Sequence, residues 1–181
     1  MDDKTLNELP RPQAVDKIPP AGLRVEISAS PEECTAVAAR LGLLRLDALQ
    51  ATLDLQRDAD GLAINVNGRL TAKVQQACVV TLVPVPATLT EAVTGCFMPP
   101  EAIPDEEGAL TLADADEPVI DPIIQGMIDL GELVVQHLSL ALDPYPRAPG
   151  AETAVRLEAS AAAGRQKPFL RLADLVKNQE K

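Results

Sequence analysis

The feature that most constrains the fold is a strict alternation of apolar and polar residues in the first half of the chain. Within residues 46–57, Leu49, Ala51, Leu53 and Leu55 alternate with Gln50, Thr52, Asp54 and Gln56. Successive side chains of a strand point to opposite faces. The pattern therefore predicts a strand with one buried face, as in an antiparallel sheet with water on its other side.

Turn residues and further alternation predict more strands along the chain. Residues 58–61 (DADG) predict a turn, and the Asn67-Gly68 pair predicts a tight hairpin. Pro84 and Pro86 favour a sheet edge or a bend. The expected strands are residues 23–27, 46–57, 62–66, 69–82, 87–97 and 118–124.

Two helices are expected beside these strands. Ser30, Pro31 and Glu33 form the start signal of a helix that ends near Gly42. Asp129 caps a second helix over 130–142, with Glu132 at the capping-box position. The fold class is therefore α+β: an antiparallel sheet of about five or six strands, with one helix before it and one after it. The pattern leaves strand order and barrel closure open.

Composition bounds the kind of protein. Apolar residues make up 46% of the 181 residues, so the chain can bury a core. That core is aliphatic, because the only aromatic residues are Phe97, Tyr145 and Phe169. No apolar run reaches the roughly 18–20 residues that span a bilayer, and the polar N-terminus does not look like a secretory signal. Three widely spaced cysteines favour reduced thiols and a cytoplasmic location.

Proline and alanine content divides the chain into three expected regions. Residues 1–22 read as an extended N-terminal segment. Residues 23–147 read as a single α+β domain with an acidic loop at 99–117. Residues 148–181 read as an Ala-rich tether followed by a short amphipathic helix, whose apolar residues Phe169, Leu172 and Leu175 form a candidate docking segment.

Negative charge is concentrated in one stretch. Between Lys73 and Arg147 there are 12 acidic residues and no Lys or Arg, within a chain of net charge −11. A field of one sign attracts cationic surfaces and repels phosphate. Solubility alone is the competing explanation of such a run. Two of these acids are explained as helix caps, and the candidate partner-binding residues are the loop acids Glu101, Asp105, Glu106, Glu107, Asp114, Asp116 and Glu117.

The motifs of common enzymes are missing from the sequence. No phosphate-binding, nucleophile-elbow or zinc-protease motif occurs. His137 is the only histidine, and it lies on the apolar face of the second expected helix. Cys78 lacks a second cysteine three positions on, where Thr81 stands, so a buried core thiol is expected there. We therefore expect no enzyme activity, no cofactor and no metal.

Three segments resemble the bacterial YceD family. GRLTAKVQQACVVTLVPV resembles its central strand, and EPVIDPIIQGMIDLGELVVQHLSLALDPYPRAPG resembles its second block. KPFLRLADLVK resembles its closing segment. The three segments occur in the family's order, and the resemblance as a whole extends over about residues 20–177. Many members have Cys-x-x-Cys where this chain has Cys78-Val79-Val80-Thr81, a form similar to the alphaproteobacterial branch. Cys78 is thus the only remnant of that pair, and a metal or redox role tied to the pair is in doubt here.

The resemblance implies a role in the accumulation of large-subunit ribosomal RNA, and therefore in ribosome assembly. The acidic stretch then predicts a basic ribosomal protein or assembly factor as the partner. Direct binding of ribosomal RNA through the basic tail is the alternative, with Arg165, Lys167, Arg171, Lys177 and Lys181 on phosphates. A metal- or thiol-dependent module is a third hypothesis. The oligomeric state is left open.

Overall fold

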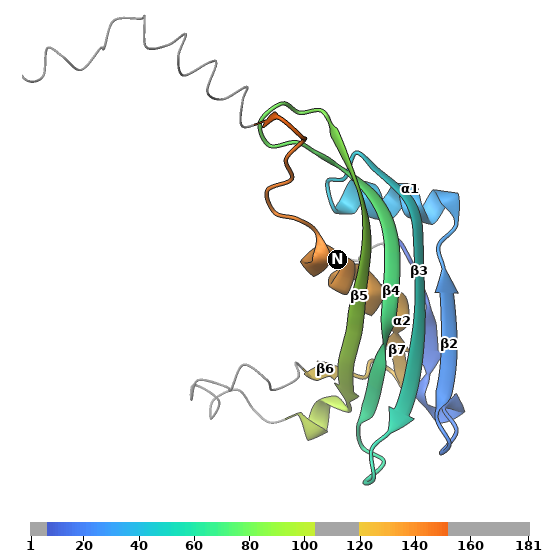
Figure 1. Cartoon of the computed structure of the whole chain (residues 1–181). Coiled ribbons are helices and arrows are strands. Elements are labelled where there is room, and N and C mark those ends of the chain that lie inside the picture. The colour runs from blue at the N-terminus through green and yellow to red at the C-terminus, as the bar shows by residue number, and fades with distance from the viewer. Residues whose placement is uncertain (1–6, 104–119, 152–181) are drawn as a thin grey trace, which may run out of the picture. The chain divides into compact units, whose positions relative to one another are not determined.

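The structure is a computed structural model that describes residues 7–103 and 120–151 (Figure 1). These residues fall into two compact units. The first is built from the described residues of Met1–Gln76 and Pro86–Pro144, and the second from those of Ala77–Val85 and Tyr145–Lys181.

The first unit is organised around a five-stranded sheet of order β2-β3-β4-β5-β6. β2 pairs antiparallel with β3, and β3 pairs antiparallel with β4. A separate two-stranded sheet joins β1 to β7. The strands are β1 Pro12–Ala14, β2 Leu23–Ser28, β3 Arg45–Arg57, β4 Ile64–Ala77, β5 Pro84–Met98, β6 Ile120–Pro122 and β7 Met127–Asp129.

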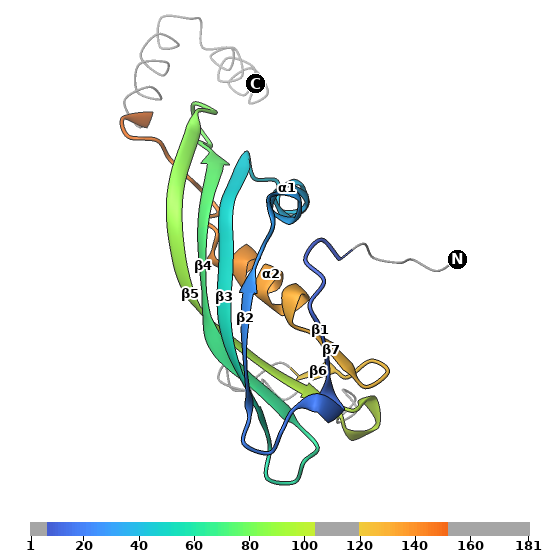
Figure 2. The ribbon, with the colours of Figure 1, turned by 90° about the vertical axis from the view of Figure 1, so that its right-hand side faces the viewer.

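Both helices cover the same face of this sheet, as Figure 2 shows from the side. α1 (Pro31–Arg40) connects β2 to β3, and α2 (Leu130–Ala141) follows β7. The core between the helices and the sheet is aliphatic, with Leu49, Val134 and Leu138 among its most buried side chains. The α+β class is therefore confirmed, since the described residues contain the two helices α1 and α2 and a mostly antiparallel five-stranded sheet.

Barrel closure, which the sequence leaves open, does not occur among the described strands: they form an open sheet whose order runs from β2 at one edge to β6 at the other. Two expectations about the fold need correction. β6 was expected to be antiparallel but pairs parallel with β5, from Cys96↔Ile120 to Met98↔Pro122. Along the sequence, the first helix also comes after β2 and before β3, so it does not precede the whole sheet.

The alternation in β3 is confirmed, and one irregularity explains its only break. Leu46 and Leu49 are both buried although they are an odd number of residues apart. A β-bulge between Leu46 and Ala48 inserts one residue against β4. Because a bulge shifts the side-chain parity by one, both leucines face the core.

The hairpin predicted at Asn67-Gly68 is wrong, because these residues lie inside β4. The chain reverses earlier, in a turn where the Asp58 N–H donates to the Ala63 carbonyl and the Gly61 N–H to the Asp58 carbonyl. Gly68 is aligned with Leu53 of β3. A Cβ atom on Gly68 would lie 2.2 Å from the Thr52 carbonyl oxygen. The glycine therefore permits a close strand approach instead of a turn.

The predicted helix caps are present, with one difference. The Ser30 side chain accepts the Glu33 N–H, and the Glu33 carboxylate accepts the Ser30 N–H, which completes the capping box of α1. Asp129 caps α2 by accepting the N–H groups of Gly131 and Glu132. The Glu132 carboxylate instead pairs with Arg40, so it joins α2 to the end of α1.

The N-terminal segment packs on the start of α2. Leu9 and Ile18 are 0% and 2% exposed, and β1 pairs with β7 through Pro12↔Asp129. The backbone of Leu9 lies directly on Gly131, where a Cβ atom would be 1.6 Å from the Leu9 carbonyl oxygen. Only glycine fits at this contact.

We predict that Gly131→Ala lowers the free energy of unfolding by about 2–4 kcal/mol, because the new methyl group must displace buried backbone. Urea unfolding followed by circular dichroism measures the effect. Ser139→Ala, on the exposed side of the same helix, is the matched control and should stay within about 0.5 kcal/mol. Equal unfolding midpoints for the two variants would contradict the contact.

Candidate functional site

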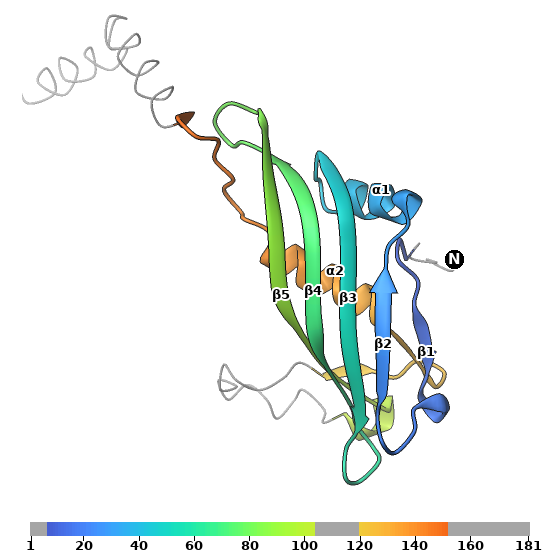
Figure 3. The same ribbon diagram turned by 45° about the vertical axis from the view of Figure 1, so that its right-hand side comes forward.

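The acidic loop predicted at residues 99–117, which we call the acidic segment, connects β5 to β6. The chain leaves and re-enters the described structure at neighbouring places. It leaves after β5 through a short 3-10 helix, η2 (Pro100–Ala102), in which Glu101 is exposed. It returns at β6, which pairs with the last residues of β5. The parallel pairing therefore holds both ends of the segment at one end of the sheet (Figure 3). Of the seven predicted loop acids the structure places only Glu101, since Asp105, Glu106, Glu107, Asp114, Asp116 and Glu117 lie outside the described residues.

An apolar hollow of about 430 Å³ lies beside β6, which we call the β6–α2 hollow. Phe97, Ile128 and Leu133 supply its most buried walls, at 5%, 3% and 4% exposure. Ile124 lies at its margin with 59% of its surface exposed. The other lining residues are Pro12, Asp121, Pro122, Gln125, Met127, Asp129, Glu132 and Gln136.

Three carboxylates line the hollow, and two of them have structural partners. Asp129 accepts hydrogen bonds from α2 and from the N-terminal segment. Glu132 pairs with Arg40 at 2.6 Å, and this hydrogen bond holds the pKa of the Glu132 carboxyl below its usual value. Within the described residues Asp121 has no ion pair or side-chain hydrogen bond. No Lys or Arg lines the hollow, so its electrostatic character is negative.

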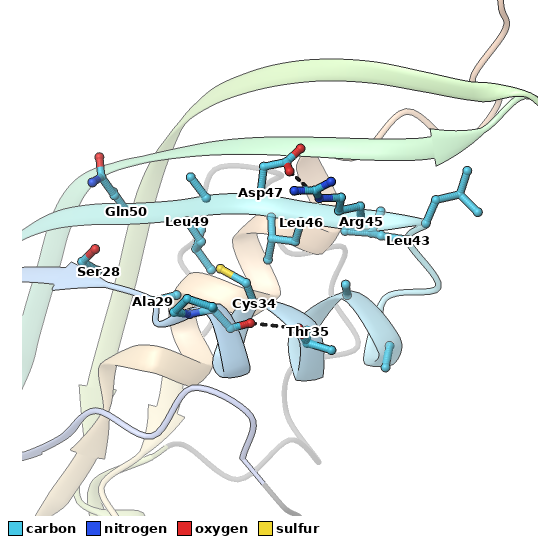
Figure 4. Close-up of a pocket in the computed structure, with 15 residues that line it drawn as sticks. Ser28, Ala29, Cys34, Thr35, Leu43, Arg45, Leu46, Asp47, Leu49 and Gln50 are labelled. Atoms are coloured by element: carbon cyan, nitrogen blue, oxygen red, sulfur yellow. Dashed lines mark hydrogen bonds and ion pairs between the residues drawn. The ribbon is translucent and has the colours of Figure 1, made fainter.

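A second hollow, of about 530 Å³, lies between α1 and β3 (Figure 4). Cys34 points from α1 toward Leu46 and Leu49 of β3, and burial raises the pKa of its thiol. The charged residues of the lining, Arg45 and Asp47, pair with each other at 2.5 Å. The hollow thus offers mostly apolar side chains, one ion pair and a thiol of raised pKa, which is a poor set of groups for catalysis.

Cys78, in the second unit, is more unusual than the sequence indicated. It is fully covered, as expected, but its Sγ accepts the backbone N–H groups of Ala148 at 3.3 Å and Thr81 at 3.4 Å. The Ala148 N–H and the Thr81 hydroxyl lower the pKa of this thiol to about 6. One sequence feature points to this setting: Thr81 stands three positions after Cys78. The Ala148 contact spans 70 residues, and no local pattern predicts it.

His137 contacts a neighbouring strand of the sheet. Its Nε2 atom lies 2.8 Å from the Thr94 carbonyl oxygen, so the ring joins α2 to β5.

Cys34, Cys78 and Cys96 are free thiols, and in the described part of the chain no three potential metal-ligating side chains come together. No helix among the described residues is long and apolar enough to cross a membrane. Phe169, Leu172 and Leu175 lie outside the described residues.

Fold and site together define an α+β domain whose sheet ends at a negatively charged surface. The chain belongs to the YceD family, since the family model described as "Large ribosomal RNA subunit accumulation protein YceD" matches residues 66–176, more than half of its length. The match covers most of β4, all of β5, β6, β7 and α2, and therefore most of the β6–α2 hollow. No curated protein and no solved structure matches the chain.

The segment Asp-Leu-Gly-Glu-Leu at 129–133 can be explained residue by residue. Asp129 caps α2, Gly131 admits the Leu9 backbone, and Glu132 pairs with Arg40. Leu130 and Leu133 are buried in the core. The segment is therefore a structural junction, in which each of the five residues makes a packing, hydrogen-bonding or ion-pair contact.

We predict that one of the three thiols titrates with a midpoint near pH 6, as read from thiolate absorbance near 240 nm, and that Cys78→Ser removes this step. Burial raises the pKa values of Cys34 and Cys96, so those thiols should titrate above 9.0. A single transition of all three thiols above pH 9 would contradict the assignment.

The same shift predicts how stability depends on pH. Between about 6 and 9.0, the Cys78 thiol is deprotonated when folded and protonated when unfolded. The unfolded state then binds more protons, so stability rises with pH. The free energy of unfolding of the native chain should therefore exceed that of the Cys78→Ser variant by an amount that grows with pH across this range. This difference should vanish as the pH falls through 6.

Proposed function

We propose that the chain supports the accumulation of large-subunit ribosomal RNA by binding a basic partner, and that it does so without catalysing a reaction. The partner is a basic ribosomal protein or an assembly factor, and contact with the RNA is indirect. The place of action is the cytoplasm.

One observation carries the proposal: 12 acidic residues and no basic residue lie between Lys73 and Arg147. Ribosome assembly uses proteins that bind RNA through their dense positive charge. An acidic surface binds such a protein and raises its association rate, and it competes with nonspecific binding to RNA. The family description, a protein of large ribosomal RNA subunit accumulation, agrees with this class of partner.

The geometry of the described residues supports the same assignment. The acidic segment begins near the exposed Glu101 and ends next to Asp121, and pairing of β5 with β6 anchors both of its ends. The described ends of the acidic segment are therefore fixed next to each other at one end of the sheet.

The test is a variant in which the seven loop acids become amides: Glu101→Gln, Asp105→Asn, Glu106→Gln, Glu107→Gln, Asp114→Asn, Asp116→Asn and Glu117→Gln. We expect co-purification of basic large-subunit proteins at low salt to be lost, and the level of large-subunit ribosomal RNA to fall. The matched control changes seven acids elsewhere, Asp2, Asp3, Asp16, Glu26, Asp58, Asp60 and Glu180, and alters the net charge equally.

Equal loss in both variants would mean that total charge, rather than this segment, is responsible. The RNA-binding alternative predicts a different pattern. Purified ribosomal RNA then binds the variant with the seven amides normally, and binding disappears when Arg165, Lys167, Arg171, Lys177 and Lys181 are replaced by Gln.

A further inference from the structure

We infer that the β6–α2 hollow is the anchor point of the partner, and that it takes one large apolar side chain from a segment flanked by Lys or Arg. The inference rests on the proposed function and adds the chemistry of the bound segment.

Size and lining fit such a side chain. Binding sites for small molecules are typically hollows of about 300–1,000 Å³ with apolar walls and few polar groups, and a hollow of that size also has room for one large side chain. The β6–α2 hollow has about 430 Å³, and buried Phe97, Ile128 and Leu133 form its walls. Ile124 exposes 59% of its surface at the margin, next to a turn in which Gln125 and Gly126 have positive φ values of 52° and 73°. Contact with a partner would remove this apolar surface from water.

The charge of the lining determines which residues of the partner can flank the anchor. Asp121 projects from β6 at the hollow without a side-chain partner among the described residues, and no Lys or Arg shares the lining. The chain of the acidic segment leaves the described structure at Ile103 and returns at Ile120, which precedes Asp121 directly. The carboxylates that line the hollow therefore attract cationic residues next to the anchor and repel acidic ones.

Backbone geometry favours recognition by side chains over addition of a strand. β6 has only three residues, and Pro122 has no N–H to donate. A partner strand paired to this edge would gain few hydrogen bonds. An apolar anchor with charged neighbours uses what the surface presents.

Two model peptides of equal charge test the inference on the full-length chain: Lys-Lys-Lys-Phe-Lys-Lys-Lys, and the same peptide with Gly in place of Phe. Burial of one large apolar side chain should make the Phe peptide bind about tenfold more tightly at about 0.1 M salt. Titration by fluorescence anisotropy gives both affinities.

Matched variants locate the binding site. Ile124→Ser should reduce the advantage of the Phe peptide to threefold or less, on the order of the loss expected for one apolar contact. Leu140→Ser is the control, because Leu140 is 83% exposed on α2 and does not line the hollow. Both residues are exposed, so both variants should fold, which circular dichroism verifies.

The outcomes separate this inference from the proposed function. If both peptides bind the native chain equally tightly and neither binds the variant with the seven amides, the apolar anchor is refuted. Binding by the acidic segment is then still supported. If neither peptide binds, the anchor is refuted as well, and co-purification alone then judges the proposed function. If Phe169→Ser tightens binding of the Phe peptide more than about fivefold, the chain's own C-terminal segment is the occupant, and the partner assignment is overturned.

Discussion

The rest of the first unit depends on the hydrogen bonds of one carboxylate, that of Asp129. Its Oδ1 atom accepts the backbone N–H groups of Arg11 at 3.1 Å, Gly131 at 3.0 Å and Glu132 at 3.3 Å, and its Oδ2 atom accepts the Asn7 amide. The carboxylate thus caps α2 and ties the N-terminal segment to it. Hydrogen bonds to a charged group contribute about 1.5–3 kcal/mol each, against about 1 kcal/mol for an ordinary helix cap. This junction places α2 on the sheet, and with it one wall of the β6–α2 hollow.

Local patterns predicted what local physics decides. The alternation of β3, the capping box at Ser30 and the cap at Asp129 follow from side-chain direction and from unsatisfied N–H groups, and all three are present. The Asn67-Gly68 turn failed because the turn at 58–61 already reverses the chain, after which Gly68 pairs with Leu53. A dipeptide preference is weaker than a continuous register of buried pairs. The parallel pairing of β6 was likewise hidden, since it joins residues more than 20 positions apart.

The candidate site was predictable in charge but not in shape. The distribution of acids is a property of the sequence, and it pointed to the segment that begins at Glu101. The hollow was not predictable, because its lining combines Pro12, Phe97 and residues between 121 and 136. Neither was the setting of Cys78, whose thiol pKa depends on the N–H of Ala148. Sequence distance, rather than weak patterning, limits prediction in both cases.

Charge and shape have different roles in the proposed complex. Attraction by the acidic segment reaches about one Debye length, near 8–10 Å in physiological salt, and acts on any cationic protein. It therefore increases the rate of encounter but distinguishes poorly among the many basic proteins of a ribosome. A buried apolar contact acts only at touching distance, so it lengthens the lifetime of the complexes whose side chain fits. Because β5 and β6 hold both ends of the acidic segment beside the hollow, encounter and discrimination occur at one place. In the proposed complex, ribosomal RNA has the higher charge density and competes with the acidic segment for the partner's flanking cations.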